Sequence, residues 1–268
     1  MSTRAERKAR KRKVVSRVLT GGAALSLMSQ KGTVRQKGTG HFCLIPEDAA
    51  QMSQMGTGHF CLIAPLAGTP VACQDLGAAT ARAHAAGRLL LADLADCPSA
   101  CPAIRLGADA MVEPLAEDRV LLRVAADALV GKGADGDWLQ DMLASGQEPD
   151  AQTDGLLAAR NQQWRRASDA AQVVASYLRC HPRVGEVRYP GLRDDPSFDL
   201  AARTLEGGFG ACVSFRLAGE GDPSHAAWGD LPGAKIASNG GPWLNLTCAA
   251  GDPMAQVLSL EGELAKVQ

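Results

Sequence analysis

An acidic residue at the end of an apolar run is the first candidate for chemistry in this sequence. Residues 89–92 read Leu-Leu-Leu-Ala, which is apolar enough for a fully buried strand of a parallel sheet. Asp93 follows directly, at the carboxyl end of that strand, where open α/β sheets bind their ligands. The sequence therefore predicts a carboxylate directed into a cleft at this edge. The alternative is that Asp93 only caps a helix or braces the following loop.

A duplicated octapeptide supplies the second candidate. Residues 38–45, Gly-Thr-Gly-His-Phe-Cys-Leu-Ile, recur as residues 56–63. Two copies are too few for a solenoid, which needs about three, and each copy could form a strand led by glycine. The duplicated histidines and cysteines have the chemistry of a tetrahedral zinc site, although His-x-Cys is tighter than the usual ligand spacing. These residues are His41, Cys43, His59 and Cys61. We predict that they bind no metal and that the segment is a duplication without a selected site.

The elements that must position Asp93 lie on both sides of it. The alanine-rich stretch from Cys73 to Ala86 predicts a helix that ends at Gly87 in a left-handed conformation. After Asp93, a loop with prolines and two cysteines leads to Leu106-Gly107-Ala108-Asp109, which predicts a turn into a second short strand. Further on, apolar residues from Leu156 to Leu178 recur at three- and four-residue spacing, the strongest helical pattern in the chain.

Composition narrows the class of protein. The chain has 268 residues, 46% of them hydrophobic, and contains no apolar run long enough to span a bilayer. Its net charge of −1 gives the whole chain no electrostatic preference for nucleic acid. Eight scattered cysteines show no dense disulfide framework, which favours reduced thiols in a cytoplasmic protein.

The amino-terminal segment differs from the rest in charge. Residues 1–17 contain eight basic residues and one acidic residue, Glu6. We interpret residues 1 to about 37 as a solvated, poorly folded arm. An export signal, an organellar transit segment and a nucleic-acid-binding tail are the alternatives.

The stretch from Gly87 to Asp118 resembles the cofactor-binding core of the Cys/Met-metabolism family of pyridoxal-phosphate enzymes, which includes the cystathionine synthases and lyases and methionine gamma-lyase. In that family a strand ends in an aspartate that pairs with the pyridine nitrogen, and a proline-bearing loop and a Leu-Gly-Ala-Asp turn follow. Asp93 and residues 106–109 match these features. The resemblance extends over about residues 65 to 268, and it places His84 at the family's histidine near the end of the preceding helix. A packing role is the alternative for His84.

Two positions depart from the family pattern. Where the resemblance implies a Ser-x-Thr-Lys motif, whose lysine binds the cofactor covalently, the chain reads Pro114-Leu115-Ala116-Glu117. Glu117 therefore stands at the lysine position and cannot form an imine. Where the family pairs the substrate carboxylate with an arginine, the aligned residue is Asn245, which cannot make that charge pair. The family's stacking tyrosine should precede residue 65, where this chain has no tyrosine.

These observations define the expected architecture and function. We predict an α/β fold with a shortened pyridoxal-phosphate-transferase-like large domain containing a parallel sheet, followed by a smaller α+β carboxyl-terminal domain. The expected boundaries are a largely disordered basic and repeat-containing segment at 1–64, a remnant of the large domain at 65–150 and the carboxyl-terminal domain at 151–268. We expect a truncated, catalytically degenerate homologue of the transsulfuration enzymes.

The resemblance also implies how such a chain would act. Family members assemble as oligomers with active sites at subunit boundaries, so we expect a homo-oligomer, or a hetero-oligomer with an intact paralogue. No membrane or nucleic-acid partner and no covalently bound pyridoxal phosphate are expected, with Asp93 as the one retained cofactor-binding position. The alternatives are an active lyase or synthase with a relocated lysine, and a nucleic-acid-binding module that uses the basic arm.

Overall fold

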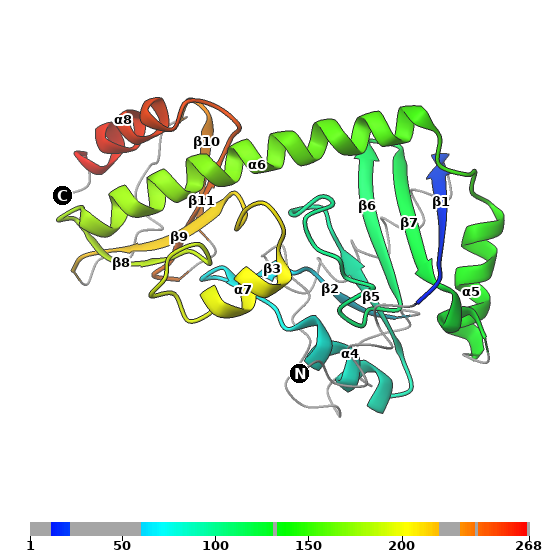
Figure 1. Ribbon diagram of the computed structural model, residues 1–268. Helices are drawn as coiled ribbons and strands as arrows, with labels where there is room; N and C mark the ends of the chain where they lie inside the picture. The colour runs from blue at the N-terminus through cyan, green and yellow to red at the C-terminus, as the bar shows by residue number, and fades with distance from the viewer. Residues whose placement is uncertain (1–11, 22–59, 131–132, 220–230, 239–240, 267–268) are drawn as a thin grey trace. The chain divides into compact units, whose positions relative to one another are not determined.

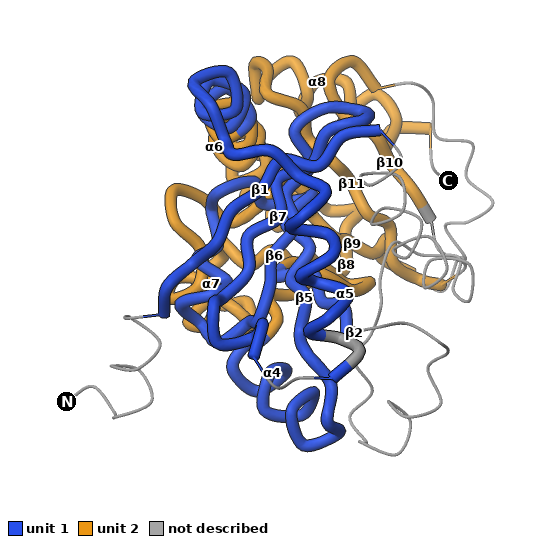
Figure 2. Tube along the Cα trace, turned by 90° about the vertical axis from the view of Figure 1, so that its right-hand side faces the viewer, with its two compact units in different colours: residues 1–65, 75–160 blue, residues 66–74, 161–268 orange. Residues whose placement is uncertain are grey.

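The computed structural model describes residues 12–21, 60–130, 133–219, 231–238 and 241–266. Its contacts divide the chain into two compact units. The first comprises residues 1–65 and 75–160, and the second comprises residues 66–74 and 161–268 (Figure 2). The chain passes from one unit to the other three times, and the third passage falls inside one long helix, α6 (Ala151–Cys180). No helix in the described ranges combines the length and apolarity needed to cross a membrane.

The first unit is built on a five-stranded mixed sheet (Figure 1). Its strands run in the order β1 (Val14–Thr20), β7 (Arg119–Ala125), β6 (Ala110–Ala116), β5 (Leu89–Asp93) and β2 (Phe60–Ile63). β2, β5 and β6 are parallel, whereas β7 and β1 are each antiparallel to their neighbours. All five residues of β5 are buried, as its uninterrupted apolar run predicted.

The helix before β5 begins and ends where its caps predict. Asp75 is the N-cap of α4 (Leu76–Ala85), and its carboxylate accepts a hydrogen bond from the Ala78 N–H at 2.9 Å. Gly87 follows with φ of 69°, a left-handed conformation that glycine adopts without steric cost. The chain thereby reverses directly from α4 into β5. The predicted helix and its glycine stop are confirmed, but the helix begins at Leu76 rather than at Cys73, which belongs to a short strand.

The amino-terminal strand corrects one expectation. We predicted that the segment 1–64 is largely disordered, but Val14–Thr20 form β1 and Phe60–Ile63 form β2. β1 pairs along its whole length with β7, and Val18 and Leu19 are buried. The prediction is wrong for these residues because the β-branched segment Val-Val-Ser-Arg-Val-Leu-Thr behind the basic run gains a strand partner, β7, from a distant part of the chain.

The rest of the first unit is helical. A 3-10 turn, η1 (Ala126–Leu129), follows β7 and leads towards α5 (Gly133–Ala144). The first turns of α6 supply Leu156 and Leu157 to a small apolar cluster with Val18, Leu115 and Leu121.

The second unit contains a four-stranded antiparallel sheet. Its order is β10 (Ala234–Ser238), β11 (Leu244–Cys248), β9 (Cys212–Leu217) and β8 (Val184–Arg188). The hairpin of β3 (Leu66–Ala67) and β4 (Ala72–Cys73), α7 (Phe198–Thr204) and α8 (Pro253–Leu264) complete this unit. Residues 161–180 of α6 contribute Val174 and Leu178 to its core, together with Phe215, Leu244 and Leu260. The helical periodicity of α6 is therefore confirmed, with Trp164 only 5% exposed.

Candidate functional site

Asp93 lies at the carboxyl end of β5, which is the middle strand of the three parallel strands of the first unit. It stands opposite Val112 of β6 and is 8% exposed. Its Oδ1 accepts a hydrogen bond from the Ala95 N–H at 3.1 Å, within the loop that follows the strand. Asp93 therefore sits at the ligand-binding edge of a parallel sheet, and it also braces its own loop.

The loop after Asp93 leads to a buried carboxylate that the sequence analysis missed. Cys97 and Cys101 are both buried in this loop, and Ser99 between them has a positive φ of 52°. Ser99 Oγ donates a hydrogen bond of 2.9 Å to Oε1 of Glu113, which is on β6 and fully buried. The left-handed backbone at Ser99 is uncommon for a residue other than glycine. It accompanies the side-chain hydrogen bond that holds the loop against β6.

Glu113 has an unusual electrostatic environment. Burial raises the pKa of its carboxyl above the ordinary 4.5, although the hydrogen bond from Ser99 and the charges of Arg123 and Arg160 oppose that shift. The nearest guanidinium nitrogen of Arg123 lies 3.5 Å from Oε2, a long ion pair. The sequence signal for this site was an acid inside an otherwise apolar strand, Ala-Met-Val-Glu-Pro-Leu-Ala. Its neighbours Ser99 and Arg160 come from distant parts of the chain.

Glu117, which the resemblance aligns with the family's lysine, lies in a hairpin turn. Ala116 of β6 pairs with Arg119 of β7, so Glu117 and Asp118 form a two-residue connection between the strands. Both turn residues are exposed. A side chain at position 117 is therefore presented to solvent at the tip of the β6–β7 hairpin.

Asn245, which the resemblance aligns with the family's substrate arginine, takes part in a chain of hydrogen bonds in the second unit. Its Oδ1 accepts from Ser214 Oγ at 2.6 Å, and its Nδ2 donates to Thr69 Oγ1 at 3.1 Å. Ser214 is fully buried on β9 opposite Asn245, and its Oγ accepts the Val71 N–H at 2.8 Å. The side chains of β9 and β11 thus hold the segment between β3 and β4. This geometry agrees with a structural role for Ser214.

Two other groups in the second unit are buried in forms that do not react at neutral pH. Burial raises the pKa of the Cys248 thiol to about 12. It likewise raises the pKa of Tyr189, whose hydroxyl donates to the Gly210 carbonyl at 3.0 Å. Both side chains are therefore protonated core residues.

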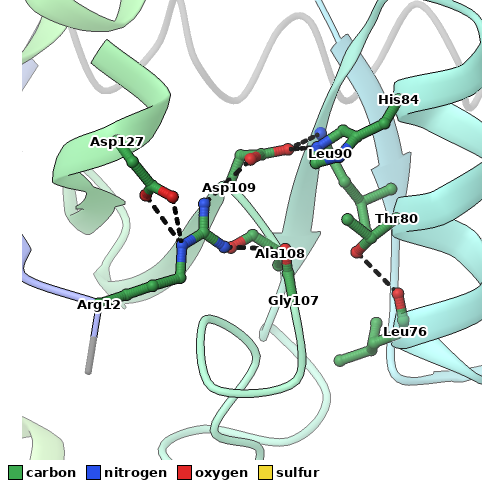
Figure 3. Close-up of polar contacts among 9 residues, drawn as sticks. All are labelled: Arg12, Leu76, Thr80, His84, Leu90, Gly107, Ala108, Asp109 and Asp127. Atoms are coloured by element: carbon green, nitrogen blue, oxygen red, sulfur yellow. Dashed lines mark hydrogen bonds and ion pairs between the residues drawn. The ribbon is translucent and has the colours of Figure 1, made fainter. Parts of the chain in front are cut away.

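Asp109, the acid of the Leu-Gly-Ala-Asp turn, is the centre of a polar network in the first unit (Figure 3). Its side chain is 2% exposed. Oδ2 lies 2.7 Å from His84 Nε2 and accepts the Leu90 N–H at 2.9 Å, whereas Oδ1 lies 3.1 Å from a guanidinium nitrogen of Arg12. The network therefore fixes the end of α4, the start of β5 and the residues before β1 against one carboxylate. His84 joins this network from the exposed side of α4.

Arg12 makes three further contacts in this network. It donates to the carbonyl oxygens of Gly107 and Ala108 at 2.9 and 2.8 Å, and its Nε lies 2.8 Å from Asp127 Oδ1 (Figure 3). Leu90 and Asp109 are at the amino ends of β5 and β6, whereas Asp93 is at the carboxyl end of β5. The network is thus a structural brace at the edge of the sheet away from the candidate site.

The histidine and cysteine repeat falls mostly on residues that the structure does not describe. His41, Cys43 and His59 are outside the described ranges, and Cys61 is on β2, partly buried. Within the described ranges, no group of three or more histidine, cysteine or acidic side chains is arranged to hold a metal. The expectation that the repeat binds no metal stays a prediction.

Comparison with known proteins connects this geometry to a family. Residues 157–243 match the family model of Cys/Met metabolism PLP-dependent enzymes. The cystathionine gamma-synthase of Mycobacterium bovis is 45% identical over 53 residues, which are 20% of this chain and 13% of that enzyme. The homocysteine synthase of Schizosaccharomyces pombe is 38% identical over 79 residues, 30% of this chain and 18% of that enzyme. The aligned stretches thus span less than a fifth of these relatives.

Solved structures extend the likeness to the fold of the chain. Cystathionine gamma-synthase from Xanthomonas oryzae pv. oryzae superposes with a TM-score of 0.61 at 19% identity, covering 93% of this chain and 81% of that one. A methionine gamma lyase from Micromonospora echinospora gives 0.61 at 18% identity, covering 93% and 80%. The fold is that of the pyridoxal-phosphate-dependent cystathionine synthases and lyases, an α/β fold whose sheet here is mixed.

The sequence match covers residues 157–243, and over the rest of the chain the likeness is one of fold. These findings support the predicted resemblance to the transsulfuration group of the Cys/Met-metabolism enzymes, whose cofactor is pyridoxal phosphate. The predicted fold class is confirmed.

Proposed function

We propose that this chain is a catalytically inactive member of its family and acts as a structural or regulatory partner of an intact paralogue. The observation that carries the proposal is the position of Glu117 at an exposed hairpin tip, where the family's Ser-x-Thr-Lys motif is replaced. An acid cannot attach the cofactor, and a carboxylate there adds a negative charge rather than a nucleophilic amine.

The residues that the structure describes do not fit a covalently held pyridoxal phosphate. A lysine that binds a carbonyl covalently is activated by desolvation or by a neighbouring charge. The lysines within the described ranges are Lys13, Lys235 and Lys266, and all three are exposed. Asp93 remains suited to contact a pyridine nitrogen, but a single carboxylate does not hold the cofactor. We therefore derive no reaction step through it.

The arrangement of Asn245 supports the same proposal independently. A substrate carboxylate needs a charged, bidentate partner, and Asn245 offers neither charge nor a second parallel donor. Its amide group is already engaged by Ser214 and Thr69. These contacts support an internal bracing role for Asn245 in place of ligand binding.

A folded chain of this family that lacks the cofactor-binding lysine and the substrate arginine can still assemble with a related subunit, which is the partner role. It is tested by co-expressing the chain with an intact family member that carries an affinity tag. Stoichiometric co-purification, with one species of summed mass in light scattering, supports the proposal. Recovery of the chain and the intact enzyme as two separate species at micromolar concentration contradicts the partner role. Catalytic inactivity is tested separately, by the cofactor-labelling experiment below.

Inactivity is tested with pyridoxal phosphate directly. The purified chain is incubated with the cofactor, reduced with borohydride and digested for mass spectrometry. We expect no cofactor mass on any specific lysine peptide, whereas an intact cystathionine gamma-synthase treated in parallel should carry it on one lysine. Stoichiometric labelling of one lysine would instead favour the alternative, an active enzyme with a relocated lysine.

The nucleic-acid alternative has less support. Arg12, one of the eight basic residues of the amino-terminal segment, is bound to Asp109 and Asp127, and Arg17 lies 3.5 Å from Glu148. Their charges are partly neutralised within the chain. Oligonucleotide binding that weakens steeply as the salt concentration rises would support this alternative.

A further inference from the structure

The second unit contains a cavity that the candidate site does not use. Its volume is about 220 Å³, and it is partly open to solvent. Its walls are the segment 70–73 of the β3–β4 hairpin, the end of β8, and the segment 195–197 with Leu200 around the start of α7. All of these residues belong to the second unit, and neither Asp93 nor Asn245 is among them. The cavity is therefore separate from the positions that the family resemblance assigns to cofactor and substrate.

Most of the cavity wall is apolar. Pro70, Val71 and Leu200 contribute hydrocarbon side chains, and Val71 is buried. Hydrogen bonds hold this wall in place, because the Val71 N–H binds Ser214 Oγ at 2.8 Å and β4 pairs with β3. An apolar wall favours a ligand with a hydrocarbon portion, and a wall that is already ordered lowers the entropy cost of binding.

Arg188, the last residue of β8, supplies the positive charge of the cavity. Its Nε lies 2.8 Å from Glu186 Oε1, and Oε2 of the same glutamate lies 3.0 Å from Arg216 Nε. Two guanidinium groups thus share one carboxylate, which leaves an excess of positive charge. Within the described residues, the terminal amino groups of Arg188 make no further hydrogen bond, so they are available for a ligand carboxylate.

Asp195 supplies a negative charge to the same cavity. Its Oδ1 accepts the Ser197 N–H at 2.8 Å and the Ser197 hydroxyl at 2.7 Å, and its Oδ2 accepts the Tyr189 N–H at 3.1 Å. These donors are neutral, and among the residues that the structure describes Asp195 forms no ion pair, either with Arg188 or with another cation. One small cavity therefore presents a cation and an anion that are not paired with each other.

We propose that this cavity binds a free aliphatic α-amino acid as a zwitterion. The carboxylate of the ligand binds Arg188, its ammonium group binds Asp195, and its hydrocarbon side chain lies against Pro70, Val71 and Leu200. A cavity of about 150 Å³ holds a benzene molecule, so the larger volume here admits a ligand of about nine non-hydrogen atoms, the size of leucine. This inference is independent of the proposed function.

Three ligands with related carbon skeletons test the proposal by isothermal titration calorimetry on the full wild-type chain. L-leucine carries both charges, 4-methylpentanoate lacks the ammonium group, and 3-methylbutylamine lacks the carboxylate. Leucine should bind at least about tenfold more tightly than either analogue, because each analogue loses one charge-assisted contact. A smaller preference for leucine overturns the proposal, as does the absence of saturable leucine binding up to about 10 mM.

Two pairs of variants locate the binding site. Arg188→Gln removes the guanidinium from the cavity, and Arg216→Gln is its matched control, since Arg216 binds the same Glu186 but does not line the cavity. Asp195→Asn and Asp194→Asn form the second pair, because Asp194 is 66% exposed and is not part of the cavity wall. The two cavity variants should weaken leucine binding by about tenfold or more, whereas the two controls should change it by less than about twofold.

A space-filling variant leaves both charges in place. Ala72 lines the cavity, so Ala72→Leu reduces the space for a ligand and should also weaken leucine binding by about tenfold or more. Circular dichroism establishes that each variant is folded before its titration, and the comparison of the three ligands on the wild-type chain does not depend on any variant. Wild-type affinity for leucine in folded Arg188→Gln, Asp195→Asn or Ala72→Leu overturns the proposal, because the amino acid would then bind elsewhere on the chain.

Discussion

The side-chain amide of Asn245 donates a hydrogen bond to the hydroxyl of Thr69, with 3.1 Å between Nδ2 and Oγ1. The two residues are far apart in sequence, on β11 and in the turn between β3 and β4. The same asparagine accepts the Ser214 hydroxyl, whose oxygen accepts the Val71 N–H. One uncharged side chain thus organises a turn in the second unit, where the family relatives lead us to expect an arginine for substrate.

Asn245→Ala should destabilise the second unit by about 1 to 2 kcal/mol, because the buried Ser214 hydroxyl loses its acceptor. Urea unfolding measures the change. The control is Thr247→Ala, two residues along the same strand and exposed, which should change the free energy of unfolding by less than about 0.5 kcal/mol. Equal changes in the free energy of unfolding for Asn245→Ala and Thr247→Ala would show that the hydrogen bonds of Asn245 do not stabilise the second unit.

Arg12→Ala should cost about 2 to 4 kcal/mol, since Asp109 would keep its burial but lose its charged partner. Arg17→Ala is the matched control from the same basic segment. The Arg17 partner Glu148 is 82% exposed, so its loss should cost less than about 1 kcal/mol. Chemical denaturation of both variants at the same salt concentration gives the comparison. A smaller loss for Arg12→Ala than for Arg17→Ala contradicts the role of the Asp109 network.

Glu113→Gln should make the protein more stable than wild type at neutral pH, and the difference should grow as the pH rises. Burial raises the folded-state pKa of Glu113 above 4.5, so its contribution to stability is full below that pH and is lost as the pH rises through the folded pKa. Glutamine cannot ionise and escapes this loss. Denaturant midpoints between pH 4 and pH 8 measure the effect, with Glu148→Gln as an exposed control. A difference that shrinks with rising pH would mean that the Arg123 and Arg160 charges outweigh burial.

Glu117→Lys alone should not restore turnover of cystathionine, methionine or cysteine. A lysine at this position extends from the tip of the β6–β7 hairpin into solvent, without the environment that activates an amine. Peptide mapping after borohydride reduction with pyridoxal phosphate should show no more label on residue 117 than on residue 118 of an Asp118→Lys control. Selective labelling of residue 117 would show that the hairpin tip can bind the cofactor.

Trp164→Ala should cost about 3 to 5 kcal/mol, because the indole is 5% exposed and packs against Gly208. Val173→Ala, on the same helix but 38% exposed, should cost much less. Thermal and urea unfolding measure both. A loss below about 0.5 kcal/mol at Trp164 would contradict the assigned buried face of α6.

The elements that could be predicted from sequence are those whose signals are local. The glycine stop at Gly87 lies within one turn of the end of α4, and the spacing of apolar residues along α6 repeats over much of the helix. The signal for β5 is likewise local, because its apolar residues are consecutive in sequence. Each of these elements was therefore identified, together with Asp93 at the end of β5.

The features that could not be predicted depend on partners distant in sequence. β1 forms a strand because β7 and Gln147 supply its hydrogen bonds. The sequence around Val14–Thr20 does not indicate which residues these partners are. Burial raises the pKa of Glu113, and the groups that oppose this shift include Ser99 and Arg160, which come from other parts of the chain. The bracing role of Asn245 likewise depends on Thr69, which belongs to a segment 176 residues away.

The pairing of β1 with β7 has a consequence for synthesis of the chain. Val14 lies opposite Ala125, so the first strand leaves the ribosome roughly a hundred residues before its partner. At translation rates of about 5 to 20 residues per second, it stays unpaired for about 5 to 20 seconds. An unpaired apolar strand can aggregate during that interval, and flanking charges reduce the risk of aggregation. Arg12, Lys13 and Arg17 provide those charges on the nascent chain, before Arg12 binds Asp109 in the folded protein.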